Sequence, residues 1–437
     1  MNASSTTPFE EYPYHAFPIA CTAPERLAVV SLLHGGPRTR TAGARVLELG
    51  CANGANLLPM AFYRHDCSFV GVDGSARQIA TATECRERLG LDNLEFLYAD
   101  FEALPADLGG PFDFIVVHGV LSWVTDAARD AVLKACARQL APAGLAYLNY
   151  NTRPGWTVRG MVRDFLLRHT AGAGDLQARS ELSREIAARV IEPLASDEHP
   201  YTQLMANEFR LVTRNHPAYI AHEYLAPHNV AYWRSEFLAL ARDFGLEYVA
   251  EADFTASSHR IIGELRDRLS DQDLTGEAIE DSLDLLCYRQ MHSPLVTLPG
   301  FDRRPASAAE FAALRMASQL EPAEGGDADT GDLRHPEGHT VEVRDEALRT
   351  ALTRLGPLWP ASLPLKELFG AVEDAREDLE YLVRCNLIEL RCAEPLGRDT
   401  DPAPLHALER ELRGHVTSPY HDMRQVGTDR HSVPQPP

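Results

Sequence analysis

Three acidic residues, each at the end of a short apolar run, stand out early in the chain. Glu48 opens the segment 48–54 (ELGCANG), and Asp73 and Asp100 end the next two runs. A turn of small residues between a strand and a helix is a common setting for a bound nucleotide or nucleoside. Asp73 is placed to accept hydrogen bonds from both ribose hydroxyls. Asp100 is placed to accept one from an adenine amine, with Phe101 against the ring.

The turn is predicted to let a ligand approach the backbone. Gly50 permits a tight turn, and the small residues Ala52 and Gly54 leave space beside it. Asn56, at the start of the next helix, and Gly74, after the second run, complete the predicted cofactor-binding set on this side. The alternative is that the small residues serve packing and that each carboxylate caps a helix or lies in solvent. Three successive strand ends with the required residue types favour the cofactor interpretation.

The composition of this turn distinguishes between cofactors. A nicotinamide dinucleotide requires a G-x-G-x-x-G turn and a helix start that faces its pyrophosphate. Here the glycine spacing differs and the turn contains no basic residue. A buried Glu48 also needs hydrogen-bond donors, either N–H groups of the turn or an ammonium of the ligand. S-adenosylmethionine, which joins an amino acid to a nucleoside without phosphate, fits these residues.

Methyl transfer from a sulfonium requires alignment and removal of a proton from the acceptor. His118 ends the fourth run and is predicted to orient the acceptor or take its proton; alternatively, its ring binds a neighbouring backbone carbonyl. Tyr150 and Asn151 end the fifth run and are predicted catalytic groups, with a turn-forming Asn as the alternative. Trp123 is predicted to line the cofactor pocket or to pack in the core. Tyr14 belongs to an aromatic N-terminal segment that is either a lid over the cofactor or a loosely packed tail.

Short β-rich runs alternate with amphipathic stretches between residues 45 and 150, which predicts βαβ units and a parallel sheet. The predicted strands are 45–49, 68–72, 94–98, 112–117 and 145–150, and the predicted helices are 56–63, 75–89 and 126–140. A helix and strand within 233–254 and a last strand at 294–298 are expected to extend the same sheet. The fold class is therefore α/β, with a Rossmann-like core.

Changes in composition along the chain predict further segments before, within and after this core. In chain order, the predicted segments are an N-terminal lid (1–40), the core (41–155 and 232–305), a helical insertion on the acceptor side (156–231), an exposed linker (306–344), a winged-helix-like α+β module (345–420) and a tail (421–437). The insertion is rich in His and aromatic residues, and the linker contains EPAEGGDADTGDLRHPEGH. The helices of the C-terminal module are acidic, which favours protein contact or dimerisation over DNA binding.

The overall charge limits the partners of the protein. The chain has 42 Lys and Arg against 63 Asp and Glu, a formal net charge of −21, so nucleic acid and anionic membranes are poor partners. No apolar run approaches the roughly 20 residues of a membrane span, and the N-terminus lacks the features of a signal peptide. We therefore expect a cytoplasmic protein. The cysteines are scattered and no His cluster has zinc spacing, so no metal site is predicted.

The segments ELGCANG, VGVDGS, YADF and FDFIVVHGVLSWV resemble those of class I S-adenosylmethionine-dependent methyltransferases. LNYNTRPGW, HEYLAPHNVAYW and LGPLWPASLPLKELF resemble bacterial members with a methyltransferase regulatory domain, a group that includes rickettsial-type outer-membrane-protein lysine methyltransferases. This resemblance implies a protein or peptide acceptor, with a lysine amine as one candidate. Two alternatives stay open: a small-molecule or natural-product O- or N-methyltransferase, and a non-catalytic regulatory protein that binds the cofactor.

Overall fold

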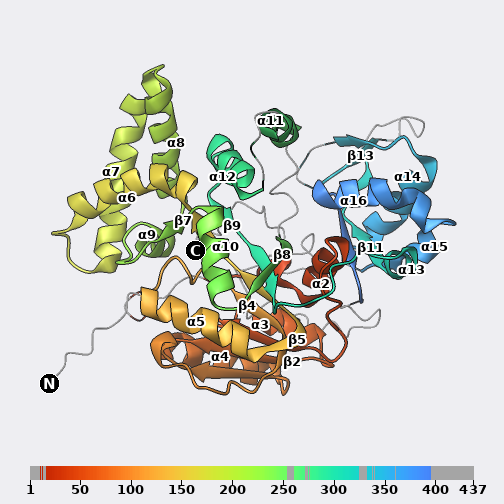
Figure 1. The fold of residues 1–437 in the computed structure, drawn as a ribbon. Coiled ribbons are helices and arrows are strands. Elements are labelled where there is room, and N and C mark those ends of the chain that lie inside the picture. Colours follow the sequence, from red (N-terminus) through yellow and green to blue (C-terminus); the bar gives the residue numbers. More distant parts are fainter. Residues whose placement is uncertain are drawn as a thin grey trace.

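The structure is a computed structural model, which describes residues 10, 12, 16–252, 260–270, 274, 276–323, 332–336, 338, 340–359 and 361–394. Figure 1 shows a central sheet with its covering helices, a helical part on one side and a smaller module of helices and short strands on the other. Within the described part of the chain, no helix combines the length and hydropathy that a membrane span requires.

A seven-stranded sheet forms the core, in the order β3-β2-β1-β4-β5-β10-β8. Its strands are β1 (Arg45–Leu49), β2 (Ser68–Asp73), β3 (Leu94–Tyr98), β4 (Phe112–Val117), β5 (Leu140–Leu148), β8 (Glu247–Glu251) and β10 (Pro294–Thr297). Strands β1 to β5 are parallel, whereas β10 is antiparallel to both of its neighbours. The predicted Rossmann-like sheet and its two additional strands are therefore confirmed. β1 and β4 are neighbours in the sheet, and the strands that follow each of them are added on opposite sides of this pair. At such a point the carboxyl ends of the two strands border a crevice that is suited to a ligand.

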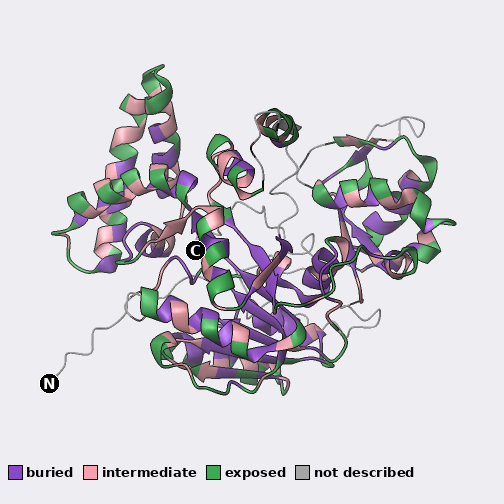
Figure 2. Ribbon diagram, in the orientation of Figure 1, coloured by how far each residue is buried: buried purple, intermediate pink, exposed green. Residues whose placement is uncertain are grey.

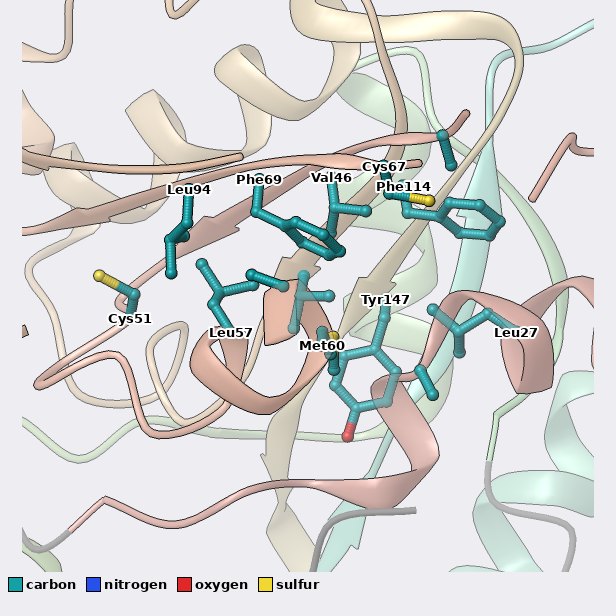
Figure 3. Close-up of a cluster of buried hydrophobic side chains, with 14 of the residues drawn as sticks. Leu27, Val46, Cys51, Leu57, Met60, Cys67, Phe69, Leu94, Phe114 and Tyr147 are labelled. Atoms are coloured by element: carbon teal, nitrogen blue, oxygen red, sulfur yellow. The ribbon is translucent and has the colours of Figure 1, made fainter. Parts of the chain in front are cut away.

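The side chains of successive residues in each strand point to opposite faces of the sheet. Val46 packs in one buried cluster and Leu47 in another. The helices over the first face are α2 (Pro24–Leu33), α3 (Leu57–Tyr63) and α4 (Ala76–Leu89), and those over the second are α5 (Asp126–Gln139) and α10 (Arg234–Asp243). Figure 2 shows the buried strands between these helices, and Figure 3 shows the first cluster in detail.

The fifth strand ends earlier than predicted. β5 stops at Leu148, and Tyr150 and Asn151 lie in β6 (Tyr150–Thr152), which pairs with β7 (Ala231–Tyr232) and β9 (Met291–His292) in a separate sheet. Asn149 stands at the break: its Oδ1 accepts the Gly119 N–H (3.2 Å), and its Nδ2 donates to the His292 carbonyl (3.2 Å). The Asn149 side chain thus binds both the loop after β4 and strand β9, and the chain leaves the main sheet at this residue.

The predicted helical insertion is present and begins at Arg153. Its helices are α6 (Arg153–Thr170), α7 (Leu176–Ser196), α8 (Pro200–Arg214) and α9 (Pro217–Glu223). They enclose their own apolar cluster, which includes Val162, Phe209 and Ile220. Beyond β8, helices α11 (Arg260–Ser270) and α12 (Glu277–Leu286) lead back to β9.

The prediction of a linker over 306–344 is wrong for its described residues. Phe311, Met316 and Leu320 are buried in the same cluster as Leu352, so this stretch is part of the C-terminal module. The polar stretch 321–339 dominates the composition of this region, so its few apolar residues do not stand out in the sequence. The module consists of α13 (Ala308–Ala312), β11 (Arg315–Ser318), β12 (Glu321–Pro322), β13 (Asp332–Arg334), β14 (Thr340–Glu342), α14 (Glu346–Leu355), β15 (Leu363–Pro364), α15 (Leu365–Leu368), α16 (Arg376–Arg384) and β16 (Ile388–Arg391).

Candidate functional site

A cavity of about 410 Å³ lies at the carboxyl ends of β1 and β4. Its walls come from three parts of the chain: the sheet, the N-terminal segment and the helical insertion. The lining residues are Ala16, Phe17, Ile19, Glu48, Gly50, Cys51, Ala52, Asn56, Asp73, Gln78, Phe101, His118, Gly119, Val120, Trp123, Val124, Asn149, Asn151, Trp156, Arg159, Tyr219, His222, Glu223, Gln290 and Met291. Most residues of the predicted site therefore line one cavity.

Asp73 connects the turn after β1 to the end of β2. Its Oδ2 accepts the Ala52 N–H (2.8 Å) and its Oδ1 accepts the Ser75 N–H (2.8 Å). Burial raises the pKa of the carboxyl, although the two N–H groups oppose this. Ala52 itself has a positive φ of 46°, an uncommon conformation for a residue with a side chain. The Asp73 carboxylate thus holds the turn in a strained form while it borders the cavity.

Glu48 is a buried carboxylate with one oxygen unsatisfied. Its Oε1 accepts a hydrogen bond from Asn56 Nδ2 (2.9 Å), whereas its Oε2 has no partner among the residues that the structure describes. Burial raises the pKa of Glu48 to about 8; the Asn56 bond lowers it and nearby Asp73 raises it further. A buried acceptor beside a cavity is stabilised by a ligand that brings a donor, most effectively a cationic one. The ammonium of S-adenosylmethionine meets this requirement.

Asn56 also joins the N-terminal segment to this site. The Ile19 N–H donates to Asn56 Oδ1 (2.8 Å), and Asn56 Nδ2 donates to Thr22 Oγ1 (3.0 Å). Together with Ala16 and Phe17, Ile19 lines the cavity. The described part of the segment therefore forms a wall of the cavity, and the predicted lid residue Tyr14 lies outside the described residues.

Three predicted cofactor residues do not line the cavity. A Cβ on Gly54 would lie 2.4 Å from Phe96, so this glycine is required for packing within the protein. Gly74 is followed by the helix start, and it borders no part of the cavity. The exposed Asp100 accepts the Glu102 N–H (3.0 Å) as a helix cap, which is the alternative role considered for it. Phe101, the next residue, does reach the cavity.

His118 lies at the end of β4 with its ring against Tyr147. His118 Nδ1 is 3.0 Å from the Tyr147 hydroxyl, which in turn donates to Ser293 Oγ (3.0 Å). With this direction of bonding, Nδ1 carries the proton and Nε2 keeps a lone pair. Burial lowers the pKa of His118 to about 4, so the ring is neutral at physiological pH. The sequence did not single out Tyr147, whose ring Figure 3 shows at the edge of the apolar cluster.

The fifth-strand residues differ in their placement. Asn151 lines the cavity, but Tyr150 does not. The Tyr150 ring is buried and stacks on Phe237 with 3.8 Å between ring centroids. The prediction that Tyr150 is a catalytic group is therefore not supported, because the break after β5 turns its side chain into the core. Trp123 lines the cavity and meets Trp156 edge to face, with centroids 5.2 Å apart.

The insertion supplies charged residues that sequence analysis missed. Arg159, on α6, lies over the Trp156 ring (5.1 Å), and it donates to Gln290 Oε1 (2.6 Å) and to Glu208 Oε2 (3.4 Å). Glu223, the last residue of α9, borders the same end of the cavity. The segment HEYLAPHNVAYW pointed to this region, but only the packing of α9 shows that Glu223 faces the cavity.

Comparison with known families and proteins agrees with this arrangement. Residues 46–144 match the family described as a methyltransferase domain, and residues 216–297 match the family described as a predicted methyltransferase regulatory domain. The chain is 35% identical to the uncharacterized protein RP789 of Rickettsia prowazekii over 248 residues, 57% of this chain and 45% of that protein. It thus spans less than half the length of this relative. It is also 33% identical to a ubiquinone biosynthesis O-methyltransferase of Chelativorans sp. over 178 residues, 38% of this chain and 68% of that enzyme.

Among solved structures, PKMT2 from Rickettsia typhi in complex with AdoHcy is similar in fold. It has a TM-score of 0.71 and 22% sequence identity, and the match covers 87% of this chain and 78% of PKMT2. The shared fold includes the sheet and extends well beyond the methyltransferase domain. Together with the cavity at the ends of β1 and β4 and the relatives above, it shows that the chain belongs to the class I S-adenosylmethionine-dependent methyltransferases and carries a methyltransferase regulatory domain.

Proposed function

We propose that this enzyme methylates a nucleophile on a protein or peptide, with a lysine amine as the acceptor group. The observation that carries the proposal is the single cavity that runs from Glu48 and Asp73 to the insertion residues Trp156, Tyr219 and Glu223. The residues at the strand ends suit the cofactor, and the insertion residues are the part of the wall that we assign to the acceptor. The fold shared with PKMT2 and the resemblance to rickettsial-type lysine methyltransferases support this choice of acceptor.

The chain's own residues account for binding and alignment. Glu48 would offer its unsatisfied oxygen to the cofactor ammonium, Asp73 would bind the ribose, and Phe101 would pack beside the adenine. S-adenosylmethionine supplies a methyl group already activated by its sulfonium. His118, neutral and oriented by Tyr147, presents a lone pair that orients the incoming nucleophile.

We expect Glu48→Gln to weaken cofactor binding by about tenfold or more, because a charge-assisted hydrogen bond is lost. In the wild type, protons compete with the cofactor ammonium for a carboxylate whose pKa is about 8. Affinity should therefore rise by about 10- to 50-fold between pH 6 and pH 8, and the variant should lose this dependence. Calorimetric titrations at several pH values measure both effects. Glu95→Gln, an exposed strand residue, is the matched control, and equal pH dependence in wild type and E48Q would refute the assignment.

We expect Asp73→Asn to weaken S-adenosylmethionine binding by about 1–3 kcal/mol, because hydrogen bonds to a charged acceptor are lost. The amide oxygen can still accept one N–H group of the turn, so the fold should be retained. Asp107→Asn is the control, since the exposed Asp107 also accepts a backbone N–H, from Gly109 at 2.8 Å. An unchanged dissociation constant for D73N would exclude the ribose contact.

The proposal is tested by transfer of labelled methyl from S-adenosylmethionine into a bacterial lysate that is then divided into macromolecular and small-molecule fractions. Base-stable label in protein, recovered as methyllysine after hydrolysis, is the expected result. Label in the small-molecule fraction would instead indicate a metabolite O- or N-methyltransferase. Cofactor binding without label in either fraction would indicate a regulatory protein that binds the cofactor.

A further inference from the structure

The same cavity contains a second carboxylate, Glu223, which the helical insertion supplies. Glu223 is half-buried at the end of α9 and lines the cavity. In the described part of the chain, the Glu223 carboxylate makes no hydrogen bond or ion pair. The Glu223 oxygens are not among the buried atoms without a partner, so they are accessible at the cavity wall, where a cationic ligand can bind them.

Among the described residues, Glu223 has no ion pair of its own, although the nearby Arg159 lowers its pKa electrostatically. The titratable and charged groups that line the cavity with Glu223 include Arg159, Tyr219, His222 and His118. Behind Arg159, Glu208 forms an ion pair with it (3.4 Å) and accepts a hydrogen bond from the Tyr288 hydroxyl (2.8 Å). Arg159 is shared between Glu208 and Gln290, so its charge is balanced by Glu208. Burial lowers the pKa values of His118 and His222 to about 4, and both rings are neutral. The acceptor end therefore carries one net negative charge when Glu223 is ionised.

We propose that Glu223 recognises the acceptor as an ammonium and accepts its proton before methyl transfer, an inference that rests on the proposed function. In this step, the Glu223 carboxylate takes one proton from the ammonium. The amine nitrogen then forms a bond to the methyl carbon while the carbon–sulfur bond breaks, and the electron pair of that bond stays on sulfur. The products are a protonated Glu223, a methylated ammonium and a neutral thioether, so charge and atoms balance.

Two further features agree with an amine acceptor. Trp123, Trp156 and Tyr219 line the same cavity as Glu223, and aromatic rings attract cations. Burial raises the pKa of Glu223 to about 7, and Arg159 lowers it, which places the carboxyl where it can both accept and release a proton near neutral pH. An anionic acceptor such as a carboxylate would be repelled by Glu223, so this charge selects amines over acids.

The test uses the full-length enzyme and two short peptides that differ only in a central lysine or norleucine. Glu223→Gln should lower kcat/KM for the lysine peptide by about 100-fold, the range of general acid–base effects. The affinity for S-adenosylmethionine should stay within about twofold, because Glu223 lies on α9 of the insertion, whereas Glu48 and Asp73 lie on β1 and β2. Wild-type kcat/KM should rise through about pH 7, and this rise should move to higher pH in E223Q. In titrations of enzyme loaded with S-adenosylhomocysteine, the wild type should prefer lysine over norleucine and E223Q should not.

Glu223→Asp keeps the charge and should recover part of the activity, whereas the exposed Glu192→Gln on α7 should match the wild type. Activity in the Asp variant would also show that a substitution at this position does not by itself prevent folding. If wild-type enzyme methylates the lysine peptide and E223Q does so with the same kcat/KM and pH profile, the role of Glu223 is refuted. If wild-type enzyme methylates no amine in peptide or lysate, the proposed function itself fails.

Discussion

Replacement of His118 with alanine is expected to lower kcat by about 100-fold and to leave the dissociation constant of S-adenosylmethionine within about threefold. The ring lies at the end of β4, lines the cavity and is held by Tyr147 at 3.0 Å. Because it is neutral, it can accept a hydrogen bond from the acceptor and align it with the methyl group. Single-turnover rates and calorimetric titrations of the same preparation separate the two quantities.

Tyr147→Phe tests the orientation of His118 without removing the His118 ring. It removes the hydroxyl that orients His118 and should lower kcat by about tenfold, less than the loss of the ring itself. Tyr98→Phe, at a residue that is 61% exposed, is the matched control and should have wild-type activity. Turnover of H118A within about threefold of wild type would show that His118 has only a structural role.

Replacement of His292 with leucine is expected to destabilise the protein by about 3–5 kcal/mol, because it leaves two buried carboxylates without a shared partner. His292 Nδ1 lies 3.0 Å from Glu251 Oε2, and Nε2 lies 2.8 Å from Asp284 Oδ2. This network joins β9, β8 and α12 behind the cavity. The midpoint of urea unfolding measures the loss, and the exposed His65→Leu is the control, with an expected change near zero.

The pH dependence of this stabilisation follows from the pKa of His292. Burial alone would lower that pKa, but Glu251 and Asp284 outweigh burial and raise it to about 9. The contribution is therefore complete below the unfolded value of about 6.5 and is lost as the pH rises through about 9. The difference in stability between wild type and H292L should narrow over that interval. A difference that widens with pH would show that His292 is neutral in the folded protein.

The first half of the fold follows from local patterns in the sequence. The strands β1 to β4 are short apolar runs bounded by turn residues, and such runs form buried parallel strands wherever helices can cover both faces. Once the sheet is parallel, its carboxyl ends must meet at one edge. For this reason Glu48, Asp73 and His118 could be placed together from the sequence alone.

The predictions for the end of the fifth strand were wrong because contacts with distant residues decide where its side chains point. Tyr147 and Tyr150 are both aromatic residues near the end of one run, yet Tyr147 contacts His118 and Tyr150 packs on Phe237. The break at Asn149 depends on its amide contacts with Gly119 and His292, which are distant in sequence. No periodicity within the run contains that information.

The sequence by itself thus determined the Rossmann-like core, the cofactor class and the place of Glu48 and Asp73 at the cavity, because strands and their ends follow from the local hydrophobic pattern. Only the tertiary structure decided which residues of the insertion line the cavity. Glu223 and Arg159 lie on helices of the insertion, and their place in the same cavity as His118 depends on how those helices pack beside the sheet. Side chains on separate elements meet through long-range packing, which a pattern along one segment does not encode.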